Sequence, residues 1–132
     1  MSRVFHRTLV LLFLGMLMLG CSSSPENGPS QAVKDFYRHL NNENYRGAMS
    51  LYNAEARQVL EDPNTASAEG FAEWARVETK DGKVDEVRVL QEQADEASAT
   101  VEYEVVYNDG TRAAHTVTLT LEDGAWKLGL IG

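Results

Sequence analysis

Cysteine is almost absent from this chain, because Cys21 is the only one among 132 residues. The chain therefore has no second thiol with which to close a disulfide of its own. Basic residues are also scarce, since twelve stand against twenty acidic ones and give a formal net charge of −8. A nucleic acid or an anionic lipid surface would need a basic patch, so we expect neither as a partner.

The sequence also lacks the common motifs of catalysis and cofactor binding. It contains no phosphate-binding glycine loop, no nucleophile elbow and no zinc-binding helix motif. His39 and Glu43 are four residues apart and could share a helical face, but no third ligand is spaced to join them. We therefore predict no metal, no cofactor and no catalytic residue that a motif identifies.

Only one long hydrophobic run is present, and it lies at the start of the chain. Leu9 to Leu19 is apolar apart from Gly15, and Arg3 and Arg7 precede it. A basic start followed by about 7–15 apolar residues is typical of a secretory signal, whereas a membrane-spanning helix needs about 20. We predict a signal peptide over residues 1–20, whose removal would leave ten basic residues against twenty acidic ones.

The residues that end this run are Met18, Leu19, Gly20 and Cys21. They resemble the lipobox of bacterial lipoproteins, although methionine replaces the usual leucine at the first position. The resemblance implies cleavage between Gly20 and Cys21, a diacylglycerol on the cysteine sulfur and an acylated new amino terminus. Two or more acyl chains make membrane anchoring stable. The alternative is a soluble secreted protein with an unused cysteine.

The resemblance also implies a location. It places the protein in the cell envelope, held to a membrane through its lipid. Because Ser22 rather than Asp follows the cysteine, the periplasmic face of the outer membrane is favoured over the inner membrane in a Gram-negative host. Residues 21–29 are polar and rich in serine, proline and glycine, so we expect them to form a flexible tether. Residues 30–132 have the length of one domain.

The first half of that domain has helical periodicity. Ser30 is the predicted N-cap of a first helix that ends at Asn41 to Asn44. Shorter helices are expected over 45–52 and 54–60, the latter capped by Asn53, with a loop at 64–66. A further helix is expected from Ser67. The apolar face of the first helix comprises Ala32, Val33, Phe36, Tyr37 and Leu40, and that of the last comprises Phe71, Trp74 and Ala75.

From Val84 onward, apolar residues recur every second position, which predicts strands. Turns are expected at 93–96, at 108–110 and at 122–124, the last two containing Asp-Gly pairs. Short hairpins join antiparallel neighbours, so the strands should form a meander with one apolar face. Helices followed by such a meander predict an α+β fold in which the helices cover the apolar face of a curved antiparallel sheet.

Three segments carry a resemblance to a known family: residues 29–37, residues 44–48 and the closing Asp123-Gly124-Ala125-Trp126-Lys127-Leu128. They resemble the nuclear-transport-factor-2-like (cystatin-like) superfamily, and more narrowly the lumazine-binding-like domain of unknown function of small bacterial lipoproteins. The resemblance implies a cone of one sheet around an N-terminal helix. It implies no settled function.

Many members of that superfamily use the mouth of the cone as a pocket. Here the candidate pocket residues are Tyr37, Trp74, Tyr103, His115 and Trp126, with Tyr45 and Tyr52 as further aromatic candidates. The alternative is that these side chains form the hydrophobic core, because aromatic residues dominate the packing of small domains. The most specific candidate is His115, which is in phase with Val117 and Leu119, because a histidine in a pocket can act as an acid or a base near neutral pH.

We therefore predict a lipid-anchored envelope protein whose domain binds a small ligand or an envelope protein without catalysis. One alternative is an isomerase-like or dehydratase-like enzyme that transfers protons through His115 with Tyr37 or Tyr103. For that chemistry Glu102 and Glu104 are poor bases, because they are in phase with the exposed face of their strand. The other alternative is a homodimer or assembly module with a filled cone and an apolar outer sheet face.

Overall fold

The computed structural model describes residues 28–62 and 68–131. The signal peptide, Cys21 and most of the tether lie outside these residues, as do the loop at 64–66 and Ser67. The described helices are α2 (Pro29–Asn41), α3 (Tyr45–Met49), α4 (Ala54–Glu61) and α5 (Ala68–Thr79). The strands are β1 (Val84–Ala94), β2 (Ser98–Tyr107), β3 (Arg112–Glu122) and β4 (Ala125–Leu128).

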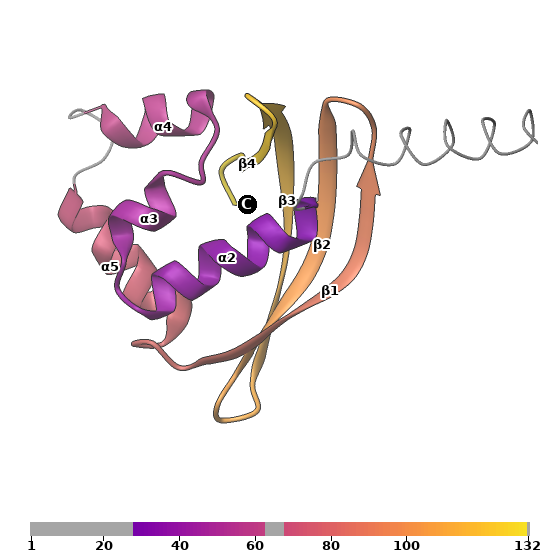
Figure 1. Cartoon of the computed structure of the whole chain (residues 1–132). Helices are drawn as coiled ribbons and strands as arrows, with labels where there is room; N and C mark the ends of the chain where they lie inside the picture. Colours follow the sequence, from indigo (N-terminus) through magenta and orange to yellow (C-terminus); the bar gives the residue numbers. More distant parts are fainter. Residues whose placement is uncertain (1–27, 63–67, 132) are drawn as a thin grey trace, which may run out of the picture.

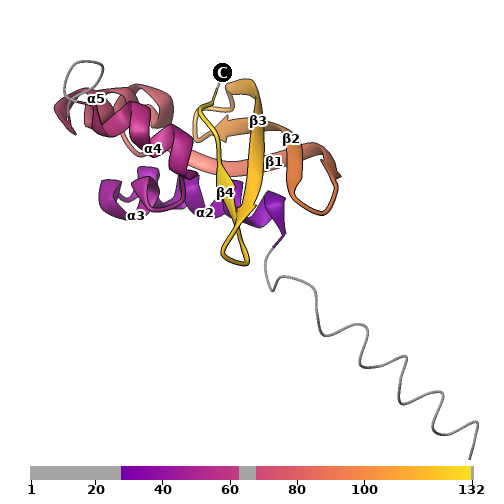
Figure 2. The ribbon, with the colours of Figure 1, turned by 90° about the horizontal axis from the view of Figure 1, so that it is seen from above.

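The four strands form one antiparallel sheet in the order β1-β2-β3-β4. In Figure 1 the sheet is curved, α2 crosses its open side, and α3, α4 and α5 gather at one end. Viewed from above, α3, α4 and α5 lie at that end, while α2 runs along the sheet (Figure 2). This arrangement confirms the predicted α+β cone, in which helices cover one face of a meander of strands.

The inner face of the sheet supplies much of the core. Every second residue of β2 is buried, namely Val101, Tyr103, Val105 and Tyr107, and Val117 and Leu119 of β3 are buried beside them. The intervening Glu102 and Glu104 lie on the outer face, where Glu104 accepts from Arg88 and Arg112. The alternation expected from the sequence is therefore confirmed.

Helix α2 is the main helix against this face. Its five predicted core residues, Ala32, Val33, Phe36, Tyr37 and Leu40, are all buried. The predicted N-cap is wrong by two positions, because the cap is Gly28 and Pro29 occupies the first helical turn. Proline has no amide hydrogen to satisfy and its fixed φ suits that position. The amide and hydroxyl of Ser30 donate instead to Glu92 of β1, at 3.0 and 2.6 Å.

Strand β1 continues further than the sequence indicates. We expected a turn at 93–96, but pairing continues to Ala94, which faces Ala99. The turn follows because the Asp95 carboxylate accepts from the amides of Ala97 and Ser98, at 2.9 and 2.8 Å. Register shifts at residues 85 and 90 also interrupt the alternation of β1.

Helix α4 and strand β4 meet at the other edge of the sheet. As predicted, the Asn53 side chain caps α4 by accepting from the amide of Ala56, at 2.8 Å. The Asn53 amide donates to the carbonyl of Leu128, at 2.7 Å, and Tyr52 forms a parallel bridge with Leu128. These main-chain contacts tie the β4 edge to the segment that leads into α4.

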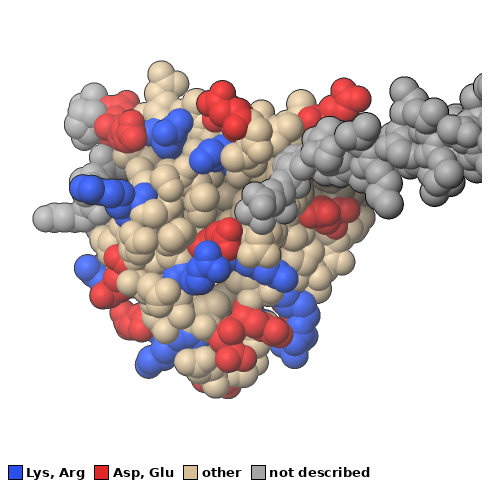
Figure 3. Space-filling view, in the orientation of Figure 1, with Lys and Arg blue, Asp and Glu red and all other residues tan. Residues whose placement is uncertain are grey.

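Charges of both signs are interspersed over the face shown in Figure 3, and no single-sign patch extends across it. Among residues 28–62 and 68–131, no helix has the length and hydropathy that crossing a bilayer requires.

Candidate functional site

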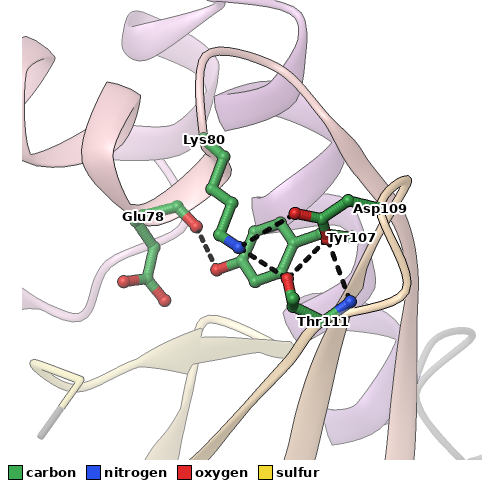
Figure 4. A network of polar contacts seen from close by, with 5 residues as sticks. All are labelled: Glu78, Lys80, Tyr107, Asp109 and Thr111. Carbon is green, nitrogen blue, oxygen red and sulfur yellow. Dashed lines mark hydrogen bonds and ion pairs between the residues drawn. The ribbon is translucent and has the colours of Figure 1, made fainter.

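The candidate site lies between α5 and the inner face of β3, and the position of α5 determines its geometry. Phe71 and Ala75 of α5 are buried, as predicted, and Trp74 is partly buried. The hydroxyl of Tyr107 donates to the main-chain oxygen of Glu78, at 2.6 Å, and so joins the end of α5 to β2. In Figure 4 this bond holds the Glu78 backbone against Tyr107, while the Glu78 carboxylate points away from Lys80 and Asp109.

A surface network reinforces this junction. Lys80 lies over the Tyr107 ring, with Nζ 4.5 Å from the ring centre, and contacts Asp109 at 3.4 Å. Asp109 accepts from the amide of Thr111 at 2.9 Å and from its hydroxyl. Bonds from the Thr111 hydroxyl and amide, with a smaller contribution from Lys80, lower the pKa of Asp109 to about 2. The network in Figure 4 thus ties the β2–β3 hairpin to α5.

Inside the cone, the Glu78 carboxylate accepts a hydrogen bond from Tyr37. The Tyr37 hydroxyl lies 2.8 Å from Glu78 Oε1 and 2.9 Å from the Tyr103 hydroxyl. Tyr37 has a single hydroxyl proton, and the carboxylate accepts it. The Tyr103 hydroxyl must therefore donate to Tyr37, so the three groups form a directed chain from Tyr103 through Tyr37 to Glu78.

His115 completes the cluster from β3. Its Nε2 lies 2.7 Å from Glu78 Oε1, an ion-pair contact whenever the imidazole is protonated. Despite that short distance, the orientation does not satisfy a hydrogen bond, and this buried atom has no hydrogen-bond partner among the described residues. The His115 ring also lies 5.6 Å from the Tyr103 ring, at an interplanar angle of 38°. We call Tyr37, Glu78, Tyr103 and His115 the cone cluster.

Burial controls the ionisation of the tyrosines around Glu78. Desolvation raises the pKa of Tyr37 far above its usual value, and Tyr103 and Glu78 raise it further. Burial, with an added repulsion from the Glu78 charge, likewise raises the pKa of Tyr52, Tyr103 and Tyr107. All four hydroxyls therefore stay neutral near pH 7, so the tyrosines of the cone cluster act there as hydrogen-bond donors and not as anions.

The five predicted pocket residues do not gather at one place. Tyr37 and Tyr103 are buried within the cone cluster, where His115 is 19% exposed and Glu78 15%. Trp74 precedes Glu78 by one helical turn and packs on Phe71 and Phe36. Trp126 lines a separate hollow of about 260 Å³ beside the start of α2, with Ala32, Leu51 and other residues. The cone cluster thus comprises three of the five.

Sequence reasoning missed Glu78, although the sequence does contain a signal for it. Glu78 follows Trp74 by four positions and Ala75 by three, so it extends the apolar stripe of α5. A lone carboxylate on such a stripe faces the core. The sequence alone did not show which strand that stripe would meet. The enzyme alternative needed Tyr37 or Tyr103 beside His115. Tyr103 does face His115 across the β2–β3 pair, whereas Glu78 stands between Tyr37 and His115.

His39 and Glu43, which the sequence spaces four residues apart, lie at the end of α2 and just beyond it. His39 Nδ1 lies 3.0 Å from the side-chain nitrogen of Asn44, and Glu43 follows the end of α2 with a positive φ of 58°. No three histidine, cysteine, aspartate or glutamate side chains in the described ranges gather as a metal site would require.

Comparisons with known proteins place the fold. The crystal structure of a Campylobacter jejuni protein, described provisionally as an NTF2-like transpeptidase, has a TM-score of 0.59 at 16% identity and covers 79% of this chain and 99% of that one. The solution structure of a SEC-C motif containing protein from Rhodopseudomonas palustris has a TM-score of 0.61 at 15% identity and covers 86% and 84%. At such identities the likeness concerns the fold alone.

A search of curated proteins found no match. The family described as "Domain of unknown function (DUF4878)" matches residues 22–129. The chain therefore belongs to this DUF4878 family, and its domain has the nuclear-transport-factor-2-like fold.

Proposed function

We infer that this chain is a lipid-anchored protein of the cell envelope whose cone domain binds a small polar ligand without transforming it. Cys21, the last of the four lipobox-like residues, would carry the lipid. The lumazine-binding-like resemblance agrees with a binding role but names no ligand. The recognition site is the cone cluster, and a partner protein of the envelope is the alternative occupant.

One observation carries this proposal: His115 Nε2 is buried and has no hydrogen-bond partner in the described part of the chain. Leaving a buried polar atom without a hydrogen bond costs about 1–3 kcal/mol, so a ligand that supplies one would be stabilised by a similar amount. Beside it, the Glu78 carboxylate accepts one hydrogen bond from Tyr37 and has capacity for more. A ligand that accepts from the imidazole and donates to Glu78 would satisfy both groups.

The test is a thermal-shift screen of the full chain in detergent micelles against polar metabolites. A ligand at about 100 times its dissociation constant adds about 2.7 kcal/mol, which gives a clear shift. We expect at least one ligand whose effect is lost in Glu78→Gln and kept in Glu102→Gln, a matched change on the outer face. Hits that survive Glu78→Gln would place recognition outside the cone cluster, and no hit at all would reject the proposal.

The pairing of Glu78 with His115 also favours a second candidate, a proton-transfer enzyme. A carboxylate 2.7 Å from an imidazole becomes its ion-pair partner once the ring has accepted a proton, and neutral tyrosines can polarise a carbonyl. If so, a carbon acid found in the screen should exchange a carbon-bound proton for solvent deuterium, and His115→Gln should abolish the exchange. Unchanged ligand in deuterated buffer would leave binding as the function.

A face-to-face dimer has less support. The outer face carries Glu102, Glu104, Arg112 and the threonines of β3, namely Thr116, Thr118 and Thr120. Such a surface lacks the apolar core that stable homodimer interfaces have.

A further inference from the structure

A second site lies outside the cone, in a groove between α2 and the edge strand β1. The groove has a volume of about 360 Å³, within the range of small-molecule sites. One wall is α2 and the other is the start of β1, where the sheet has no further strand. The side-chain amide of Asn41 holds the two walls together at one end. Its oxygen accepts from the main-chain amide of Val84 at 2.9 Å, and its nitrogen donates to the main-chain carbonyl of Val84 at 3.4 Å.

The two walls carry opposite charges. The α2 wall presents Lys34 and Arg38, one helical turn apart, and the β1 wall presents Asp85 and Glu86. Arg38 is neutralised by Asp35 at 2.8 Å. Glu86 is likewise neutralised by Arg88, at 2.6 Å.

The other two charged residues of the groove are Lys34 and Asp85. Neither side chain forms an ion pair or a hydrogen bond among the described residues. They also form no ion pair with each other. The groove therefore keeps a free cation on one wall and a free anion on the other.

The backbone explains how Asp85 comes to line the groove. Val84 pairs with Tyr107 and Glu86 with Val106, so Asp85 is an extra residue in β1 and faces no residue of β2. Such bulges occur at sheet edges and redirect a side chain away from the ordinary alternation. The bulge thus adds a carboxylate to an edge that Lys34 borders from the helix.

We propose that this groove binds a small zwitterion, an amino acid or short peptide with free termini, whose carboxylate pairs with Lys34 and whose ammonium pairs with Asp85. Only a ligand with both charges satisfies both walls. Because both contacts are open to water, each ion pair contributes at most about 1 kcal/mol, and the expected dissociation constant is on the order of tens of millimolar. The groove shares Tyr37 with the cone cluster, but Lys34 and Asp85, which supply its two charges, lie outside that cluster.

The experiment is an NMR titration of the isotope-labelled full chain in micelles with alanine, dialanine and trialanine. We expect saturable shifts at the amides of Lys34 and Asp85, and the length that binds best reports the distance between the two charges. Trialanine acetylated at its amino terminus or amidated at its carboxyl terminus should bind at least about fivefold more weakly, since one ion pair is lost. Lys34→Glu and Asp85→Lys should each weaken the unblocked peptide by a similar factor.

The matched control is Lys83→Glu, an exposed charge reversal at a residue that does not line the groove. It should leave binding unchanged, and equal melting temperatures of the variants show that folding is intact. The proposal is overturned if no peptide gives a saturable shift up to about 200 mM, well above the expected dissociation constant. It is overturned equally if doubly blocked trialanine binds as well as the free form, or if Lys83→Glu weakens binding as much as Lys34→Glu.

Discussion

Removing the Tyr37 hydroxyl should destabilise the domain far more than removing the Tyr103 hydroxyl, although the two groups bond to each other. In Tyr37→Phe, Glu78 loses a hydrogen bond to a charged group, worth about 1.5–3 kcal/mol. The Tyr103 hydroxyl, fully buried, is also left without its acceptor, at a cost of about 1–3 kcal/mol. Because Glu78 is 15% exposed, water replaces part of the first loss, so we expect about 3 kcal/mol in all.

Tyr103→Phe removes one neutral hydrogen bond and leaves the Tyr37–Glu78 bond intact, so it should cost about 1 kcal/mol. The double variant has no orphaned hydroxyl. It should therefore cost about 2 kcal/mol, roughly half the sum of the single changes, because neighbours that share one network are not additive. Each kcal/mol corresponds to about 4–8 °C in melting temperature for a domain of this size.

The assay is urea unfolding followed by the fluorescence of Trp74 and Trp126, the only tryptophans in the chain. Tyr45→Phe is the control, since its hydroxyl contacts no polar partner in the described ranges, and it should change stability by less than about 0.5 kcal/mol. If Tyr103→Phe costs as much as Tyr37→Phe, or if the two changes are additive, the directed chain from Tyr103 to Glu78 is wrong.

Three further predictions concern capping, pH and anchoring. Asn53→Ala should cost about 1–2 kcal/mol by urea unfolding, because a buried cap is lost, while the exposed cap Asn44→Ala should cost less. Burial raises the pKa of Tyr37 and Tyr103, so their contribution to stability is complete below pH 10 and is lost as the pH rises above it. The absorbance of their tyrosinate forms should therefore appear together with unfolding. Titration of these tyrosines while the domain stays folded would contradict this. Cys21→Ser should move the protein from the membrane fraction to the soluble fraction and abolish the mass increment of lipidation, whereas an unchanged distribution would reject the anchor.

Much of the fold could be predicted because its signals are local. The inward register of His115 followed from its phase with Val117 and Leu119, and the cap at Asn53 followed from its side chain. The bulge at Asp85 could not be predicted in the same way. An extra residue in a strand leaves the composition of the strand unchanged and is visible only against the partner strand.

The candidate site was harder to predict than the fold, because its contacts join distant segments. Glu78 meets Tyr37, 41 positions earlier, and His115, 37 positions later, only once α5 has docked on the sheet. Alternation along β3 identified His115, whereas the partner that sets its chemistry depends on the tertiary packing of a helix.

The most direct test of the proposed recognition site is a crystal structure of the chain with the ligand that stabilises it most in the thermal screen. The proposed function predicts ligand atoms within hydrogen-bond distance of both the His115 Nε2 and the Glu78 carboxylate. Ligand density confined to the groove beside Lys34 or to the hollow beside Trp126, with His115 and Glu78 unchanged, would contradict it.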